Sequence, residues 1–460
     1  MIMKKYNLSK LNRMILAILI CSSLLPIAAC KKYLDAKPDQ TLTTPASLND
    51  LQALLDYYAL LNYNYPLAAE VASDDYYLTD NGLSGITTDY FRDYYLWQKN
   101  DNTNIEWQAY AKVYNANIIL DNLDRLATSA AEQGRRNTIK ASALFYRGLY
   151  FFSLSQLFAP PYDQASAATD LGIPLRLSSD FNLPSKRATV AATYNQMISD
   201  VQQALAALPN ESPYRIRPTK PAAYGLLARM FLLKQDYQMA KLYADSCLQL
   251  NGKLLDYNSL DTVAAIPIAQ ANPEVIFDSR TLGSLPLSPT LWNVDTNLYK
   301  TYHSNDLRKS IFFKKTTTGT YTHKGNYTGT NTGFAFTGIA TDELYLIRAE
   351  CLARLGDAAG ALNDLNLLLK NRIKTKAYQP LTYTNPNELL KVILLERRKE
   401  LVFRTMRWSD IRRLSKEPLH AIAPTRLYKG KVYELPIGSE RYLFQLPKIV
   451  IDETGMPQNP

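Results

Sequence analysis

Side chains that could carry out catalysis are sparse in this sequence. The three histidines, His303, His323 and His420, lie far apart, with no His-Glu-x-x-His helix and no glycine-rich phosphate loop. The adjacent Asp74 and Asp75 could join a carboxylate dyad only with a distant partner, and we expect a solvated turn there. The sequence predicts no catalytic residue, no cofactor and no metal centre, although it leaves a structural metal in the loops undecided. Any function then rests on binding.

Tyrosine is the residue type whose number stands out, with 32 tyrosines against 14 phenylalanines. A tyrosine ring has a flat apolar face and a hydroxyl at its edge, which suits amphipathic ligands such as sugars or peptides. Tyrosines at helical spacing are expected to fill helix interfaces: Tyr110, Tyr114, Tyr146 and Tyr150. Six rings outside clear helical patterns are the predicted ligand contacts, with plain loop packing as the alternative: Tyr76, Tyr77, Trp97, Trp292, Tyr299 and Tyr302.

Cys30 is the residue for which a chemical modification is predicted. It follows a basic segment, an apolar stretch from Met14 to Leu25, and the small residues Ala28 and Ala29. This order is typical of a secretory signal. A membrane-spanning helix would need about 20 apolar residues, and this stretch is shorter and is followed by Pro26. We expect residues 1–29 to be a signal peptide and Cys30 to carry the lipid that anchors the protein to a membrane.

The charge of the remaining chain argues against a nucleic-acid partner. The formal net charge is +10, from 52 basic and 42 acidic residues. Four basic residues precede Cys30, so their removal lowers the net charge to +6. Clusters of Lys and Arg interleaved with aromatic residues, as in nucleic-acid-binding surfaces, are absent from the sequence.

Helical periodicity dominates the elements that must position these rings. Two segments, around Ala222–Lys234 and Leu344–Leu355, have apolar residues on one helical face and correspond to each other at a fixed offset. Ala228, Asp236 and Ala240 in the first match, in order, Ala349, Asp357 and Ala361 in the second. Small residues on both sides of a short turn allow close helix packing, as in the tetratricopeptide unit. The alternative is a coincidence between two ordinary helical hairpins.

Further helices are expected over ranges with similar patterns: Leu48–Leu61, Glu106–Leu126, Thr138–Phe158 and Tyr194–Leu208, and one capped by Asn385 with Pro386 at its first position. Between Asn251 and Ala340 the helical pattern fails, and Lys315–Gly333 indicates a hairpin or exposed loops. The predicted fold is mainly α, with tetratricopeptide-like repeats, long loop-rich excursions and minor β hairpins. The expected parts are residues 30–250 and 251–460, packed as one composite domain.

Two further patterns concern structure more than function. Cys247 and Cys351 lie inside apolar helical patterns, so buried free thiols are expected, with a disulfide as the alternative. The charged stretch that begins at Glu396 favours a structural ion-pair network over an anion site, including a pair between Glu400 and Arg404 four residues apart on a helix.

Taken together, these motifs resemble the SusD/RagB family of surface nutrient-binding lipoproteins over essentially the whole chain. The residues that carry the resemblance occur in the family's order: Cys30–Asp35 with Pro38, Ala141–Tyr150 with Leu157–Pro161, Pro221–Ala240, Asp306–Arg308, Leu344–Glu350 with Ala361–Arg372, Glu396–Leu401 with Arg407–Arg413, and Leu446–Lys448 with Gln458–Pro460. The chain departs from the family pattern at Phe403–Thr405, where many members carry an acidic residue and a glycine.

The resemblance implies a tetratricopeptide-rich α fold without cofactor chemistry, on the outer membrane and facing the exterior. It also implies docking on a TonB-dependent channel of the SusC type, to which the protein delivers oligosaccharides or similar nutrient oligomers. Two other functions remain as alternatives. One is a periplasm-facing helical-repeat adaptor that binds protein partners, and the other is a surface glycoside hydrolase.

Overall fold

The computed structural model describes residues 45–281, 291–330, 334–383 and 385–460, and residues 47–460 form one compact unit. The predicted signal peptide and Cys30 lie outside the described residues. Within the described ranges, no helix is both long enough and apolar enough to cross a membrane.

Helices dominate the first half of the described chain. The 3-10 turns there are η3 (Glu106–Gln108) and η4 (Ala130–Glu132). The α-helices are α3 (Leu48–Leu55), α4 (Tyr58–Leu61), α5 (Ala68–Val71), α6 (Asp80–Ser84), α7 (Asp89–Tyr95), α8 (Ala109–Leu123), α9 (Gln133–Phe158), α10 (Val190–Ala204), α11 (Lys220–Leu233) and α12 (Tyr237–Leu250). The strands are β1 (Tyr76–Leu78), β2 (Leu171–Pro174) and β3 (Arg187–Thr189).

The second half mixes short strands with helices. Its 3-10 turns are η5 (Tyr257–Ser259), η7 (Thr375–Ala377) and η8 (Glu440–Tyr442). Its helices are α13 (Thr296–Thr301), α14 (Arg308–Ile311), α15 (Thr341–Arg354), α16 (Ala358–Lys370), α17 (Pro386–Glu400), α18 (Arg407–Leu414) and α19 (Lys448–Thr454). Its strands are β4 (Val275–Phe277), β5 (Trp292–Val294), β6 (Phe313–Lys315), β7 (Tyr321–His323), β8 (Ile339–Ala340), β9 (Thr425–Tyr428) and β10 (Lys431–Glu434).

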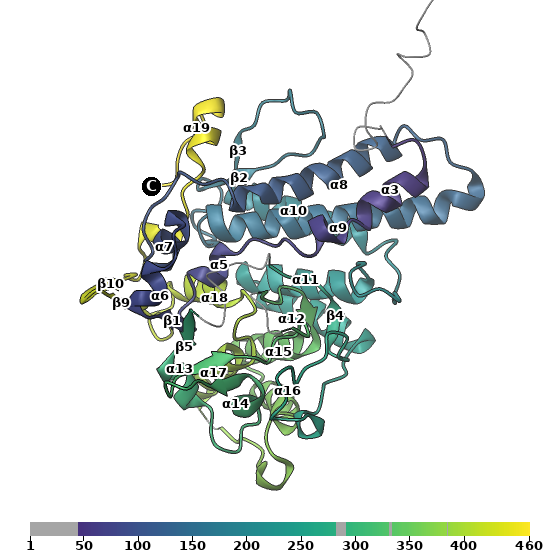
Figure 1. Cartoon of the computed structure of the whole chain (residues 1–460). Coiled ribbons are helices and arrows are strands. Elements are labelled where there is room, and N and C mark those ends of the chain that lie inside the picture. The colour runs from purple at the N-terminus through teal and green to yellow at the C-terminus, as the bar shows by residue number, and fades with distance from the viewer. Residues whose placement is uncertain (1–44, 282–290, 331–333, 384) are drawn as a thin grey trace, which may run out of the picture. The chain divides into compact units, whose positions relative to one another are not determined.

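The predicted repeat is confirmed as two stacked helical hairpins. Helix α11 packs on α12, α15 packs on α16, and α12 joins the two pairs by packing on α15 (Figure 1). Asp236 and Asp357 cap α12 and α16 in the same way, since each carboxylate accepts a backbone N–H three residues on, at 3.1 and 2.8 Å. The alanines Ala228 and Ala349 are fully buried, so the small residues do mark close helix contacts.

Three long helices form the scaffold for one candidate site. Helices α8, α9 and α10 lie side by side, with α9 in contact with both of its neighbours (Figure 1). Arg147 of α9 reaches both neighbours: its guanidinium donates two 2.7 Å hydrogen bonds to Asp200 of α10 and one of 3.1 Å to Asn117 of α8. These buried bonds fix the position of α8, because an unpaired charge there would be costly.

Within the part of the chain that the structure describes, the strands form five antiparallel pairs. Three are local hairpins (β2–β3, β6–β7 and β9–β10). The β6–β7 hairpin spans Phe313–His323 and so overlaps the first part of Lys315–Gly333, where a hairpin or exposed loops were expected. The other two join distant segments: β4 with β8, and β1 with β5. In the β1–β5 pair, Tyr77 lies opposite Asn293 and Leu78 lies opposite Trp292.

Most predicted helices are present, with shifted ends. The expected helix Leu48–Leu61 is divided in two: α3 ends at Leu55, and α4 begins at Tyr58. The side chain of Asn385 accepts the backbone N–H of Asn387, and Pro386 begins α17, as predicted. Cys247 and Cys351 are free buried thiols, which excludes the disulfide alternative. Burial raises the pKa of both thiols far above its usual value.

The charged C-terminal stretch is a buried ion-pair network, as expected, but its partners differ from the prediction. Glu400 binds Arg308 and Arg372 at 2.9 and 2.7 Å, not Arg404, which pairs with Asp342. The predicted pair fails because α17 ends at Glu400. Beyond that residue Phe403 and Thr405 adopt positive φ angles.

Asp74 and Asp75 do not form a solvated turn. Both carboxylates bind arginines from the other end of the chain: Arg398 pairs with Asp74 at 3.2 Å and with Asp75 at 3.0 Å, and Arg407 pairs with Asp74 at 2.5 Å. Burial opposes ionisation of Asp74, but the two arginines outweigh it and lower the pKa. The error arose because the partners are more than 300 residues away, where sequence spacing carries no signal.

Candidate ligand-binding site

Four of the six aromatic residues predicted to contact a ligand lie in the core. Tyr76, Trp97, Trp292 and Tyr302 have at most 4% of their surface exposed. The inference that rings outside helical patterns belong to open loops is therefore wrong for these four. A ligand on the surface of this structure cannot stack on them.

Strand pairing and specific hydrogen bonds explain why these rings are buried. Along β1 and β5, alternate residues face inward, which brings Trp292 to 5.9 Å from Tyr76, between ring centroids. The Trp97 indole N–H donates to the carbonyl of Ala72 at 2.9 Å, and the Tyr302 hydroxyl donates to the carbonyl of Lys399 at 2.8 Å. These rings hold loops and strands together.

The other two predicted residues, Tyr77 and Tyr299, are half-buried and connected by a chain of contacts. Tyr77 lies opposite Asn293 in the β1–β5 pair, and the Asn293 side-chain oxygen accepts the Thr320 hydroxyl at 2.5 Å. The next residue, Tyr321, stacks on Tyr299 with 3.7 Å between ring centroids and 18° between ring planes. We call Tyr77, Asn293, Tyr299, Thr320 and Tyr321 the tyrosine patch.

Charged and polar groups surround the tyrosine patch. The Lys309 ammonium lies 4.8 Å from the centroid of Tyr299, within cation–π range. Among the residues that the structure describes, the side-chain amide N–H groups of Asn293 and the hydroxyl of Tyr77 have no hydrogen-bond partner. Burial raises the pKa of the Tyr77 phenol, and the nearby Asp295 carboxylate adds to this, so the hydroxyl keeps its proton. The tyrosine patch thus offers ring faces together with uncommitted donors.

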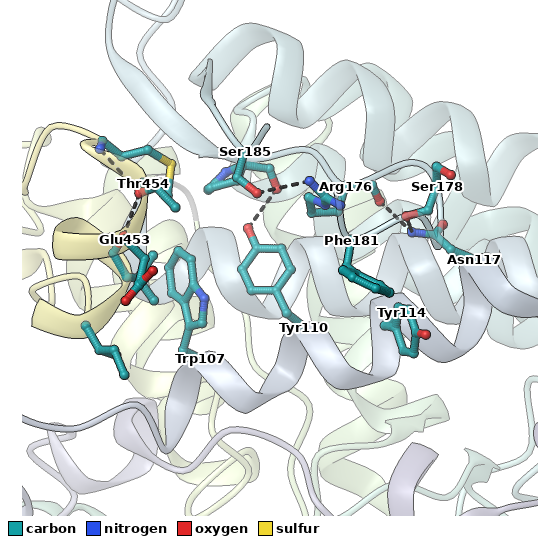
Figure 2. Close-up of a pocket in the computed structure, with 14 residues that line it drawn as sticks. Trp107, Tyr110, Tyr114, Asn117, Arg176, Ser178, Phe181, Ser185, Glu453 and Thr454 are labelled. Carbon is teal, nitrogen blue, oxygen red and sulfur yellow. Dashed lines mark hydrogen bonds between the residues drawn. The ribbon is translucent and has the colours of Figure 1, made fainter. Parts of the chain in front are cut away.

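A second candidate is an open pocket of about 390 Å³ between α8, the segment 174–185 and α19 (Figure 2). We call it the aromatic pocket. Its lining residues are mainly rings and apolar side chains: Trp107, Tyr110, Tyr114, Asn117, Pro174, Arg176, Ser178, Phe181, Ser185, Ile449, Val450, Glu453, Thr454 and Met456. Cavities of this size are typical of small-molecule sites.

Helical spacing brings three of these rings onto one face. Trp107, Tyr110 and Tyr114 are three and four residues apart, so they follow one side of η3 and α8. Trp107 and Tyr110 have ring centroids 4.7 Å apart. Phe181 faces this row from the β2–β3 loop, beside Tyr114 (Figure 2), and is 81% exposed.

Most polar groups around the aromatic pocket are already bonded within the protein. The Tyr110 hydroxyl donates to the carbonyl of Pro174 at 2.7 Å, and the Asn117 amide donates to the carbonyl of Arg176 at 2.8 Å. The Arg176 guanidinium donates to the Ser185 hydroxyl at 3.1 Å and to the carbonyl of Asp180 at 2.5 Å. The walls are therefore preformed, and they present mostly carbon.

Sequence reasoning assigned Tyr110 and Tyr114 to helix interfaces and missed the pocket. The assignment is correct for Tyr146 and Tyr150, which are buried. It is wrong for Tyr114, which is 47% exposed. The available signal was the row Trp107, Tyr110 and Tyr114 on one helix face, followed by an isolated phenylalanine in a polar loop.

Within the described ranges, no group of three or more His, Cys, Asp and Glu side chains is arranged to hold a metal ion.

Two family models match the chain. One, described as starch-binding and associating with the outer membrane, matches residues 32–232, and one described as the SusD family matches residues 287–448. The chain is 22% identical over 526 residues to the SusD-like protein P2 of Formosa agariphila, with all of both chains covered.

Solved structures show the same fold. A SusD superfamily protein from Bacteroides thetaiotaomicron has 22% identity and a TM-score of 0.72, covering 90% of this chain and 100% of the other. A laminarin-binding SusD-like protein has 18% identity and a TM-score of 0.64, covering 89% and 97%.

Proposed function

Since the chain belongs to the SusD family, we propose that it binds oligosaccharides, or similar nutrient oligomers, at the outer membrane and delivers them to a TonB-dependent transporter of the SusC type. The description of the matching family model names starch binding and the outer membrane, and one structural relative binds laminarin. The proposal further includes attachment through lipid on Cys30, with the protein facing the exterior.

We place the saccharide on the tyrosine patch. The single observation that carries this assignment is the stacked pair Tyr299 and Tyr321 beside Asn293. The C–H face of a sugar ring packs on a tyrosine ring, while its hydroxyls bond to amide and phenol groups at the edge. Tyr77 and Tyr299 remain proposed contacts, and Tyr299 packs on the buried ring of Phe313, with 5.6 Å between ring centroids.

The expected affinity is weak. An aromatic contact contributes about 0.5–1.5 kcal/mol beyond burial of area, and association itself costs several kcal/mol. A few such contacts on an open surface predict a dissociation constant between about 1 µM and 1 mM. Weak binding suits a protein that passes its ligand to a transporter.

Calorimetry with a panel of oligosaccharides tests the site. For the oligosaccharide that binds most tightly, Tyr321→Ala should weaken binding about tenfold, because the substitution removes one ring of the stack. Tyr57→Ala is the matched control, since Tyr57 is 55% exposed and lies in the segment between α3 and α4. If Tyr321→Ala and Tyr77→Ala fold and bind like the parent, the saccharide site is elsewhere. Release of shortened products from the same panel would instead favour the glycoside hydrolase.

Anchor and partner are tested on cells. Cys30→Ala should release the protein from the membrane fraction, and purification through a tag should recover a large outer-membrane barrel. A lid on a channel needs an interface of about 1,000 Å² or more, which survives mild detergent. Protease that cleaves the protein only after outer-membrane permeabilisation would favour the periplasmic adaptor.

A further inference from the structure

The aromatic pocket differs from the tyrosine patch in position and chemistry. It lies on α8 and α19, whereas the tyrosine patch lies on β1, β5 and β7 with α13. We propose that the aromatic pocket is a second ligand site, which binds a neutral aromatic ring bearing a hydroxyl group, of the phenol class. The proposal goes beyond saccharide binding at the tyrosine patch and does not depend on it.

The shape of the pocket favours a flat ring. Trp107 and Tyr110 have centroids 4.7 Å apart, and Tyr114 follows about 6 Å further along the helix axis. Phe181 closes the opposite side beside Tyr114 (Figure 2). A ring placed between these walls can make offset or edge-to-face contacts with more than one of them. A volume of about 390 Å³ has room for one or two rings.

Hydrogen bonds within the protein hold the walls of the aromatic pocket in place. The β2–β3 loop that carries Phe181 is tied to α8 by Asp121, whose carboxylate accepts the Ser179 backbone N–H at 2.8 Å and the Ser179 hydroxyl at 2.7 Å. Burial would raise the pKa of Asp121, but these hydrogen bonds outweigh it and lower the pKa. On the other side, Arg187 donates to the carbonyl of Pro457 at 3.1 Å, which anchors the segment after α19. A preformed cleft loses little entropy when a ligand binds.

The polar groups select the class of ligand. The Tyr110 hydroxyl and the Asn117 amide donate their hydrogens to backbone carbonyls, so a densely hydroxylated sugar would find few partners inside. Glu453 is an exposed carboxylate at the Trp107 end of the pocket (Figure 2), and no residue that the structure describes is paired with it. At this end of the pocket it accepts hydrogen bonds from a ligand hydroxyl and repels an anionic group, whereas the Arg176 guanidinium lies near Phe181 and is bonded to the loop. A neutral ring with a hydroxyl therefore fits better than a sugar or a carboxylate.

The fluorescence of Trp107 gives a local readout. The chain has four tryptophans, and Trp97, Trp292 and Trp408 are buried, whereas Trp107 is half-buried in the pocket wall. Acrylamide quenching in the folded protein therefore reports mainly on Trp107. The probe is 4-hydroxybenzyl alcohol. Its comparison compounds are cyclohexylmethanol for an aliphatic ligand, 4-hydroxybenzoate for an anion and methyl β-glucoside for a sugar.

We expect 4-hydroxybenzyl alcohol to shield Trp107, and each comparison compound to bind at least about fivefold more weakly. Phe181→Ala should weaken binding of the probe about fivefold, with Leu183→Ala on the same loop as the matched control. Glu453→Gln should reduce the discrimination against 4-hydroxybenzoate. Trp107→Phe should abolish the signal, and Tyr77→Ala should leave it unchanged.

Three results would overturn the proposal. The first is that cyclohexylmethanol binds as tightly as 4-hydroxybenzyl alcohol. The second is that the probe binds the parent and Phe181→Ala equally. The third is that millimolar probe does not shield Trp107. Because Phe181 is 81% exposed, its removal leaves the core intact, so lost binding cannot be attributed to unfolding. Loss of saccharide binding in Tyr321→Ala with unchanged Trp107 shielding would separate the two sites.

Discussion

The tyrosine patch and the aromatic pocket both present rings, but the polar groups around those rings are used differently. In the tyrosine patch, the Asn293 amide N–H groups and the Tyr77 hydroxyl have no partner among the described residues. In the aromatic pocket, the Tyr110 hydroxyl, the Asn117 amide and the Arg176 guanidinium all bond within the protein. Ring content alone therefore does not identify a ligand class; what decides is whether the donors beside the rings are free.

The two regions also differ in what lies beneath the rings. The tyrosine patch rests on a layer of core rings, where Trp292 lies 4.4 Å from Phe403 and 5.9 Å from Tyr76, between centroids. The aromatic pocket rests on one helix, held by the bonds of Arg147. Damage beneath the first region should therefore unfold the protein, whereas damage to the loop of the second should loosen it only locally.

The largest effect is expected beneath the tyrosine patch. Trp292→Ala should lower the free energy of unfolding by about 3–5 kcal/mol, because a large buried ring leaves a cavity. Tyr77 is half-buried on the neighbouring strand β1, and Tyr77→Ala should lower the free energy of unfolding by less than about 1 kcal/mol. Urea denaturation measures both. Similar losses in the two variants would contradict the division of this region into core rings and surface rings.

An intermediate effect, which depends on pH, is expected at Glu106, the neighbour in sequence of the pocket residue Trp107. Glu106, next to Trp107, is buried and accepts the backbone N–H groups of Leu67 and Ala68 at 2.9 and 3.1 Å. Burial raises its pKa to about 7, although these hydrogen bonds and Lys112 oppose the rise. Between the usual carboxyl range and pH 7, the folded protein holds a proton that the unfolded chain has released. Glu106 therefore contributes less stability as the pH rises through that window.

Glu106→Gln should remove this share of the pH dependence. Between roughly pH 5 and pH 8, the free energy of unfolding should fall by about 1–3 kcal/mol more in the parent than in the variant. Urea midpoints at the two pH values measure the difference. Glu388→Gln on α17 is the control, since Glu388 makes an exposed pair with Lys391. A parallel pH dependence in the parent and Glu106→Gln would show that the carboxyl titrates as it does in water.

The helical half of the fold could be predicted because its signals are local. The matched pairs Ala228 with Ala349 and Asp236 with Asp357 occupy equivalent structural positions, since packing and capping depend on residues within one hairpin. The two ring regions could not be predicted equally well. Trp292 is buried by pairing with a strand more than 200 residues earlier, and Tyr114 faces a loop that periodicity does not place.

The smallest effect on global stability is expected at Arg176. A substitution there gives the most direct test of whether the two regions behave independently. Its guanidinium holds the β2–β3 loop closed through Asp180, Leu183 and Ser185. Arg176→Leu removes these bonds but keeps much of the apolar stem, so global stability should fall by only about 1 kcal/mol or less.

Local opening is where Arg176→Leu should act, because a surface loop can unfold separately from the core. Hydrogen exchange should accelerate about tenfold or more at the amides of Ser179, Asp180 and Asn182, which hydrogen-bond within the loop or to Asp121. The Thr316–Thr320 turn, which ends in the tyrosine patch, is the internal reference and should exchange as in the parent. Probe binding to the aromatic pocket should weaken while saccharide binding does not. If exchange rises equally at both loops, the two regions are coupled, and their treatment as independent sites is wrong.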